Sequence, residues 1–360
     1  MFLGTSCFGQ FLGDESSKKQ TLQGLSKLYN HDYKEAESLI SPVIAKYNSH
    51  PVSYLLKAYM LQEKYMPIEQ NAAQSAAYLS ILKQCIAKAE VLNKTPAYSA
   101  EASFYLLAAY GYLSKYYHAK KDYIKAGNEA RKAYSYLKKG YDYVKSNPEF
   151  YFTNGLYRYY REQYPESHPQ IKPIIYFFAD GNKSLGLRDL KSAATYGLFT
   201  KVEAQVFLTT INLKYENNAT EALKYARLLH DNYPNNNHFL LMLVESLVAN
   251  KKWNEASIAN TKLGKYKSTM SQVAYAIFNG EILLNSNEYE KAFDSFEKAN
   301  SFALSAYGDE DLKSMALLGM GKAKLALGQK SKAKELLEDC LEIAEYKRIR
   351  MEANLALKNL

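Results

Sequence analysis

A small residue recurs at nearly constant spacing through the C-terminal half of this 360-residue chain. The recurring residues are Ala222, Ala256, Ala292 and Ala333. The steps between them are 34, 36 and 41 residues. A small side chain at a helix crossing lets two backbones approach, and larger side chains fill the grooves beside it. Because one helix pair cannot bury its own apolar face, this period predicts several stacked pairs.

The residues around each alanine resemble the tetratricopeptide repeat family. Trp253 and Tyr289 each precede an alanine by three positions, Gly328 precedes one by five, and Pro234 follows one by twelve. The most recognisable stretch reads NSNEYEKAFDSFEKA. Tyr33-x-x-Ala36 repeats the theme near the N-terminus. The resemblance implies an all-α, right-handed superhelical solenoid of about six or seven antiparallel helix pairs.

The middle of the chain is less regular, because Pro148, Pro165, Pro169 and Pro173 interrupt it. Residues 148–235 loosely resemble the tetratricopeptide repeat 39/inclusion-body clearance family. The matching residues are Gly155, Tyr157, Gly181, Gly186, Leu187, Leu190, Ala193 and Gly197. This resemblance implies a repeat scaffold and carries no catalytic residue.

These patterns predict four regions. Residues 1–18 are expected to be a flexible N-terminus, and 19–147 to form tetratricopeptide-like pairs with long helices. Residues 148–200 are expected to be an irregular helical segment, and 201–360 to hold the C-terminal repeats. Whether residues 60–100 and 148–200 follow the repeat stays open at this point.

The first ten residues, MFLGTSCFGQ, resemble the end of a secretory signal peptide that lacks its basic start. This predicts a bacterial protein that is exported or periplasmic, with a cytoplasmic location as the alternative. From residue 20 onward no stretch approaches ~18 uninterrupted apolar residues, so no membrane-spanning segment is predicted.

Sequence motifs for chemistry are missing. Cys7, Cys85 and Cys340 are far apart, and none of the six His has another His three or four residues away. Gly319-Met320-Gly321-Lys322 lacks the earlier glycine and the following Ser or Thr of a phosphate-binding loop. We predict that the chain is no enzyme and needs no cofactor or metal.

In the tetratricopeptide frame, the first helix of each pair lines a concave groove that holds extended or helical peptides. Counting back from the recurring alanines gives the predicted groove residues. They are Phe207, Ile211, Lys214, His238, Leu241, Glu245, Val248, Ile277, Glu281, Leu284, Leu318 and Lys322. A protein or peptide is therefore the expected partner.

The net charge of +9 is unevenly distributed. Residues 115–145 carry nine Lys or Arg against three acids, a balance of 9 − 3 = +6. A basic stripe on one helix face is predicted from Lys125, Arg131, Lys132, Lys138, Lys139 and Lys145, with tyrosines interleaved. Such a surface suits an acidic protein, an anionic lipid or single-stranded nucleic acid. A solvated helix face, with the tyrosines packed between repeats, is the simpler explanation.

The leading hypothesis is a non-catalytic scaffold that binds a protein on its concave face. One alternative is a binder of nucleic acid or another polyanion through the basic stripe, with nucleic acid the less favoured partner. A second is a structural subunit of a bacterial envelope assembly. An unrecognised enzyme is a further alternative. The sequence does not determine the oligomeric state.

Overall fold

The computed structural model describes residues 11–143, 147–167, 179–306 and 310–360, and the regular structure in these ranges is helical. The chain divides into two compact units. Unit 1 contains residues 1–162 and 178–204, and unit 2 contains residues 163–177 and 205–360. Each unit is described by itself below.

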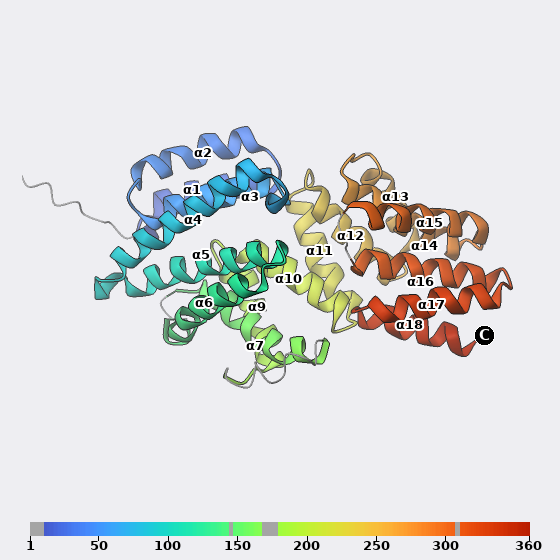
Figure 1. The fold of residues 1–360 in the computed structure, drawn as a ribbon. Coiled ribbons are helices and arrows are strands. Elements are labelled where there is room, and N and C mark those ends of the chain that lie inside the picture. The colour runs from blue at the N-terminus through green and yellow to red at the C-terminus, as the bar shows by residue number, and fades with distance from the viewer. Residues whose placement is uncertain (1–10, 144–146, 168–178, 307–309) are drawn as a thin grey trace, which may run out of the picture. The chain divides into compact units, whose positions relative to one another are not determined.

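Unit 1 begins with three helix pairs (Figure 1). They are α1 (Glu15–Tyr29) with α2 (Tyr33–Lys46), α3 (Pro51–Lys64) with α4 (Ala72–Leu92), and α5 (Ser99–Ala119) with α6 (Tyr123–Tyr143). We call the first helix of each pair the A helix and the second the B helix. The A helices α1, α3 and α5 also contact one another. Residues 60–100, which the sequence left open, thus contribute to the second pair.

Two further helices, α7 (Phe150–Ser167), which belongs to unit 1 up to residue 162, and α9 (Lys183–Tyr196), meet at a pair of glycines. A Cβ atom on Gly155 would lie 2.9 Å from the backbone nitrogen of Leu190. A Cβ atom on Gly186 would lie 2.7 Å from the backbone nitrogen of Tyr159. Only glycine lets the two backbones approach this closely. The predicted irregular segment therefore contains a helix crossing, while residues 168–178 lie outside the described ranges.

Unit 2 contains most of α10 (Lys201–Lys214), and continues with alternating B and A helices. They are α11 (Ala219–Asn232), α12 (Asn237–Ala249), α13 (Trp253–Leu263), α14 (Thr269–Asn285), α15 (Tyr289–Ala306), α16 (Glu310–Ala326), α17 (Lys330–Ile343) and α18 (Lys347–Lys358). Contacts pair α12 with α13, α14 with α15, and α16 with α17. The A helices α12, α14, α16 and α18 contact one another in that order. They form one side of the unit, which we call the A-helix face.

The turn inside a pair has a repeated backbone conformation. Six turns hold one residue in the left-handed region, at His31, Lys121, Asn217, Lys251, Asn287 and Gly328. Each lies five residues before a buried alanine, namely Ala36, Ala126, Ala222, Ala256, Ala292 or Ala333. Left-handed backbone is costly for residues other than glycine, so its recurrence marks a turn imposed by the helix packing. The same register therefore runs through both units.

The recurring alanines lie where the sequence placed them. Ala222, Ala256, Ala292 and Ala333 are all 0% exposed. Between pairs, Phe296 of α15 fills the space beside two glycines of neighbouring A helices. A Cβ atom on Gly280 would lie 2.7 Å from this ring, and one on Gly319 would lie 2.3 Å from it. The glycines of the rejected phosphate-loop motif are thus packing positions.

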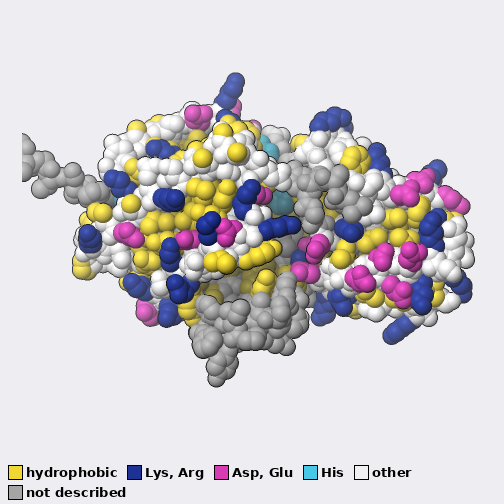
Figure 2. Space-filling view, viewed as in Figure 1, with side chains coloured by type: hydrophobic (Ala, Val, Ile, Leu, Met, Phe, Trp, Pro, Cys, Tyr) yellow, Lys and Arg dark blue, Asp and Glu magenta, His cyan; other side chains and the backbone are white. Residues whose placement is uncertain are grey.

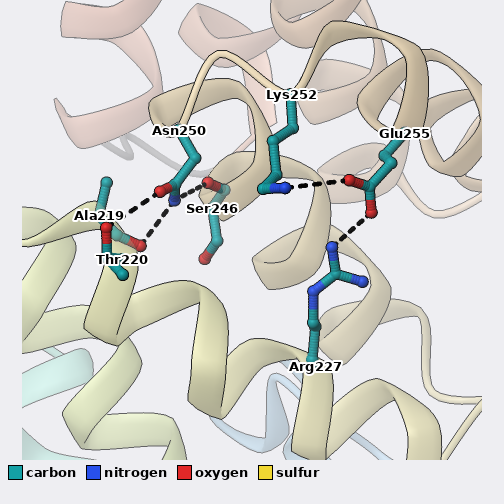
Figure 3. A network of polar contacts seen from close by, with 7 residues as sticks. All are labelled: Ala219, Thr220, Arg227, Ser246, Asn250, Lys252 and Glu255. Atoms are coloured by element: carbon teal, nitrogen blue, oxygen red, sulfur yellow. Dashed lines mark hydrogen bonds and ion pairs between the residues drawn. The ribbon is translucent and has the colours of Figure 1, made fainter.

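Polar contacts also link neighbouring repeats of unit 2 (Figure 3). The side-chain amide of Asn250 donates to the carbonyl oxygens of Ala219 and Ser246, at 2.7 Å each. The carboxylate of Glu255 lies between Arg227 of α11 and Lys252. The turn after α12 is therefore tied to the first turn of α11.

The first described residues, from Phe11 onward, differ from the flexible N-terminus that the sequence predicts. Phe11, inside the segment predicted to be a flexible N-terminus, is fully buried and packs against the rings of Tyr47 and Phe199. The carboxylate of Asp14 accepts hydrogen bonds from Lys46 and Tyr47, at 2.5 and 2.7 Å. The described N-terminal residues are therefore attached to unit 1.

Candidate interaction surfaces

The predicted groove residues fall on the A helices of the C-terminal repeats, but their accessibility varies widely. Five apolar members are buried in the helix packing: Ile211, Leu241, Val248, Ile277 and Leu318. Phe207 and Leu284 are half-buried, and His238 is exposed. Fewer apolar side chains are therefore available to contact a partner than the sequence suggested. Most of them are buried in the core.

Three charged members of the groove, Glu245, Glu281 and Lys322, come together on the A-helix face of unit 2. The ammonium of Lys322 on α16 lies 2.7 Å from a carboxylate oxygen of Glu352 on α18, and 4.0 Å from one of Glu281 on α14. Arg348 lies one turn before Glu352 and contacts it at 2.8 Å. The carboxylate of Glu245 on α12 is one of the groups that raise the pKa of Arg348. We call these five residues the charge ladder.

The charges of the ladder stabilise one another. Glu281 is the main group that raises the pKa of Lys322, with Glu352 contributing and burial opposing. Burial alone would raise the pKa of Glu352, but Lys322 and Arg348 hold it below its ordinary value. Both groups therefore stay ionised near neutral pH. Glu245 and Glu281 are buried, and the other three residues are half-buried. Ion pairs in such places add little net stability, because desolvation offsets their attraction.

A second cationic centre lies elsewhere in unit 2, at Lys214, the last residue of α10. Its ammonium lies 2.7 Å from carboxylate oxygens of both Asp311 and Glu345. It also lies 5.6 Å from the ring centroids of Tyr215 and Tyr346. These partners already occupy Lys214, so this predicted groove residue connects parts of unit 2.

The described members of the basic stripe are exposed along α6: Lys125, Arg131, Lys132, Lys138 and Lys139. Lys145 lies outside the described residues. The carboxylates of Asp122 and Glu129 pair with Lys125 and Lys132, at 2.7 and 3.0 Å. The predicted stripe therefore exists, with part of its charge neutralised by its own helix.

The tyrosines of the stripe lie beneath its lysines. Lys132 lies 5.3 Å from the ring centroid of Tyr110, and Lys139 lies 5.3 Å from that of Tyr136. The rings of Tyr110 and Tyr136 stack on each other with centroids 6.1 Å apart. Rings covered in this way are poor platforms for nucleic acid bases, which need an open aromatic face.

Sequence reasoning missed a buried cluster in unit 1, the Tyr–Glu cluster of Tyr29, Tyr59, Glu63, Tyr112 and Glu203. The hydroxyl of Tyr29 donates to a carboxylate oxygen of Glu203 at 2.5 Å. The rings of Tyr59 and Tyr112 meet edge to face, with centroids 5.4 Å apart. Burial raises the pKa of Glu63 and of Glu203 to about 7 each. Tyr29 and Glu203 are 174 residues apart, so no local pattern could reveal the pair.

Among the residues that the structure describes, no group of three or more His, Cys, Asp or Glu side chains could hold a metal ion. Cys85 and Cys340 are buried, and burial raises the pKa of each thiol. Within the same residues, no helix combines the length and the apolar character that a bilayer crossing requires.

Helix α17, a B helix of unit 2, carries a group of exposed acids. On α17 they are Glu335, Glu338, Asp339 and Glu342. Figure 2 shows acidic side chains gathered on the side of unit 2 that carries α16 and α17. Acidic side chains are therefore exposed on this side of unit 2.

No family model matches the chain, and no curated protein matches its sequence. Two solved structures are similar at 14% identity. A tetratricopeptide repeat protein from Parabacteroides merdae ATCC 43184 matches 84% of this chain and 100% of its own, with a TM-score of 0.35. Yeast Tom70 matches 96% of this chain and 88% of its own, with a TM-score of 0.37.

The fold assignment rests on the helix pairs and the repeated turns. The looser resemblance of residues 148–235 to the inclusion-body clearance family stays a prediction. The resemblance to the tetratricopeptide repeat family is confirmed for the fold: the chain is an all-α, tetratricopeptide-like array of consecutive helix pairs.

Proposed function

We propose that this chain is a non-catalytic scaffold that holds an extended segment of a partner protein on the A-helix face of unit 2. The observation that supports this most is the charge ladder. Three successive A helices contribute Glu281, Lys322 and Glu352 to one continuous set of charges. Because such pairs add little to stability, recognition is the better reason for their presence.

The chemistry of the ladder favours a basic partner segment. Glu245, Glu281 and Glu352 face two cations, so carboxylates are in excess by 3 − 2 = 1. Half-buried Leu284 lies on the same helix as Glu281 and offers an apolar contact. A segment with one or two Lys or Arg residues beside an apolar residue complements this surface.

The test is a selection of extended peptides from a displayed random library, followed by affinity measurements on the full chain. Wild type should enrich peptides that combine basic and apolar residues. Glu352→Gln should bind the selected peptides about tenfold more weakly, because one carboxylate is lost. Glu338→Gln, on exposed α17, is the matched control and should bind as wild type does. Equal losses in both variants, or no enrichment, would rule out the A-helix face.

The basic stripe is a weaker candidate for the same role. Two of its lysines are paired with acids of α6, and its tyrosine rings are covered. Export to the periplasm and membership of an envelope assembly rest on residues 1–10, which lie outside the described ranges. Both stay predictions, and fractionation of the native cells with an antibody against the chain would test the location.

A further inference from the structure

The turn between α5 and α6 exposes two neighbouring apolar side chains. Tyr123 is 63% exposed and Ile124 is 81% exposed. Among the described residues, no other large apolar side chain is as exposed as Ile124. Both residues follow Lys121, whose left-handed backbone reverses the chain between the two helices. The apolar pair therefore lies at the end of a helical hairpin, and none of the helices that the structure describes covers it.

Lysines surround this apolar pair. Lys115, Lys120, Lys121 and Lys125 are all exposed, and Asp122 is the single acid among residues 115–125. The local balance is 4 − 1 = +3. Figure 2 shows hydrophobic and basic side chains side by side over this part of unit 1. Apolar side chains next to several lysines are the combination by which peripheral proteins attach to anionic bilayers.

We infer that the α5–α6 turn docks on the surface of an anionic lipid bilayer. Tyr123 and Ile124 enter the boundary between headgroups and acyl chains, and Lys120 and Lys121 contact the phosphates. A tyrosine suits this depth, because its ring is apolar and its hydroxyl reaches water. The inference concerns unit 1 and is independent of the peptide surface proposed for unit 2.

A bilayer explains the turn better than nucleic acid does. Ile124 has no ring and cannot stack on a base, whereas a bilayer takes up an aliphatic side chain readily. The ring of Tyr117 beside the turn is covered by Lys125, at 5.5 Å from its centroid. An acidic protein could pair with the lysines, but it would also need a pocket for Ile124.

The test is cosedimentation of the full chain with lipid vesicles. The chain should bind vesicles of phosphatidylglycerol and phosphatidylcholine, and bind phosphatidylcholine vesicles at least tenfold more weakly. The variant Tyr123→Ser/Ile124→Ser should lose about tenfold in affinity for the anionic vesicles, since two apolar side chains no longer leave water. The variant Tyr196→Ser/Ile258→Ser is the matched control, because it removes a tyrosine and an isoleucine that are 69% and 65% exposed elsewhere. It should bind as wild type does.

A charge variant tests the lysines separately. Lys120→Gln/Lys121→Asn should weaken binding to anionic vesicles and reduce its dependence on salt. Asparagine is used at position 121 because it tolerates the left-handed conformation there. Hydrogen exchange on wild type gives a readout without mutation: amides 118–126 should gain protection on anionic vesicles. No binding to these vesicles, or equal loss in the control variant, overturns the inference. So does tight binding of single-stranded DNA or polyglutamate that the apolar variant leaves unchanged.

Discussion

One buried carboxylate, Glu149, supports the start of helix α10. Glu149 accepts hydrogen bonds from the backbone N–H groups of Phe199 and Thr200, at 3.2 and 3.0 Å, and from the hydroxyl of Thr200 at 2.8 Å. These donors lie just before α10 begins at Lys201. The first N–H groups of a helix have no partner within it, so a buried helix start needs an outside acceptor. Glu149 supplies that acceptor from about fifty residues earlier in the chain.

Replacing this acceptor should be costly. Glu149→Ala leaves several buried donors without a partner, so the free energy of unfolding should fall by about 3 kcal/mol. Glu149→Gln keeps one acceptor oxygen and should lose less. Urea unfolding followed by circular dichroism measures both, with Glu335→Ala on exposed α17 as the control. If the alanine variant were as stable as the control, Glu149 would not support the start of α10.

The buried carboxyls of unit 1 also predict a pH dependence. Burial raises the pKa of Glu63, Glu101 and Glu203 to about 7 each. A carboxyl with a raised folded-state pKa binds more protons when folded, so stability falls as pH rises through that pKa. Burial lowers the pKa of His50 to about 4. This histidine therefore changes stability with pH only below its ordinary pKa near 6.5. Between about pH 6.5 and 8 the carboxyls therefore dominate, at about 1 kcal/mol for each group.

Thermal unfolding at several pH values checks this expectation. The melting temperature should fall between pH 6.5 and 8, and Glu203→Gln should reduce the slope, because one of the carboxyls that titrate in this range is removed. Glutamine keeps an oxygen that can accept the hydrogen bond from the hydroxyl of Tyr29. Glu338→Gln, on the surface of unit 2, should leave the slope unchanged. A melting temperature that stays constant over this range would show that these carboxyls ionise as easily in the folded chain as in the unfolded one.

Among the helices, two glycines separate the effect of helix packing from the effect of helix propensity. A Cβ atom on Gly186 would meet the backbone of α7, but one on Gly127 of α6 would meet nothing within 4 Å. Gly186→Ala should therefore force α7 and α9 apart and lower the free energy of unfolding by about 2 kcal/mol. Gly127→Ala should raise it by about 1 kcal/mol, because alanine favours helix. Chemical denaturation of the two variants gives the comparison, and equal effects would contradict the crossing.

The same contrast explains what the sequence could predict about the helices. Ala256 and Ala292 revealed the repeat because a crossing needs a small side chain at a fixed step. On α6, helical spacing places Ala130, Ala133 and Leu137 toward one face. Ala133 and Leu137 are buried, but Ala130 is exposed, so only part of that face is covered.

The candidate surfaces were only partly predictable. Glu281 and Lys322 were expected on one face from the repeat period, but their partners Arg348 and Glu352 lie on α18, beyond the last recurring alanine, Ala333. For most of the apolar groove residues, the sequence predicted a partner-binding surface, whereas the structure buries their side chains. Ile277 and Leu318 have the correct spacing, yet neighbouring helices bury them to 1% and 0% exposure. Spacing indicates a face of a helix, whereas burial depends on residues distant in sequence.

For the whole molecule, the two compact units predict two unfolding steps. In repeat arrays, stability is carried by contacts between neighbours, so distant parts can unfold separately. The chain offers a convenient probe, because its single tryptophan, Trp253, belongs to unit 2. Tryptophan fluorescence should therefore follow unit 2, while circular dichroism follows both units.

Two alanine variants separate the steps. Gly319→Ala would place a Cβ atom 2.3 Å from the ring of Phe296 in unit 2, so it should move the fluorescence transition to lower urea. Gly186→Ala acts in unit 1 and should move part of the circular dichroism transition while the fluorescence midpoint stays in place. If both variants shifted both signals equally, the units would unfold together. If the two transitions shift separately, a partner that binds one unit should stabilise that unit alone. Binding adds stability only to the part of the chain that must be folded for the partner to bind.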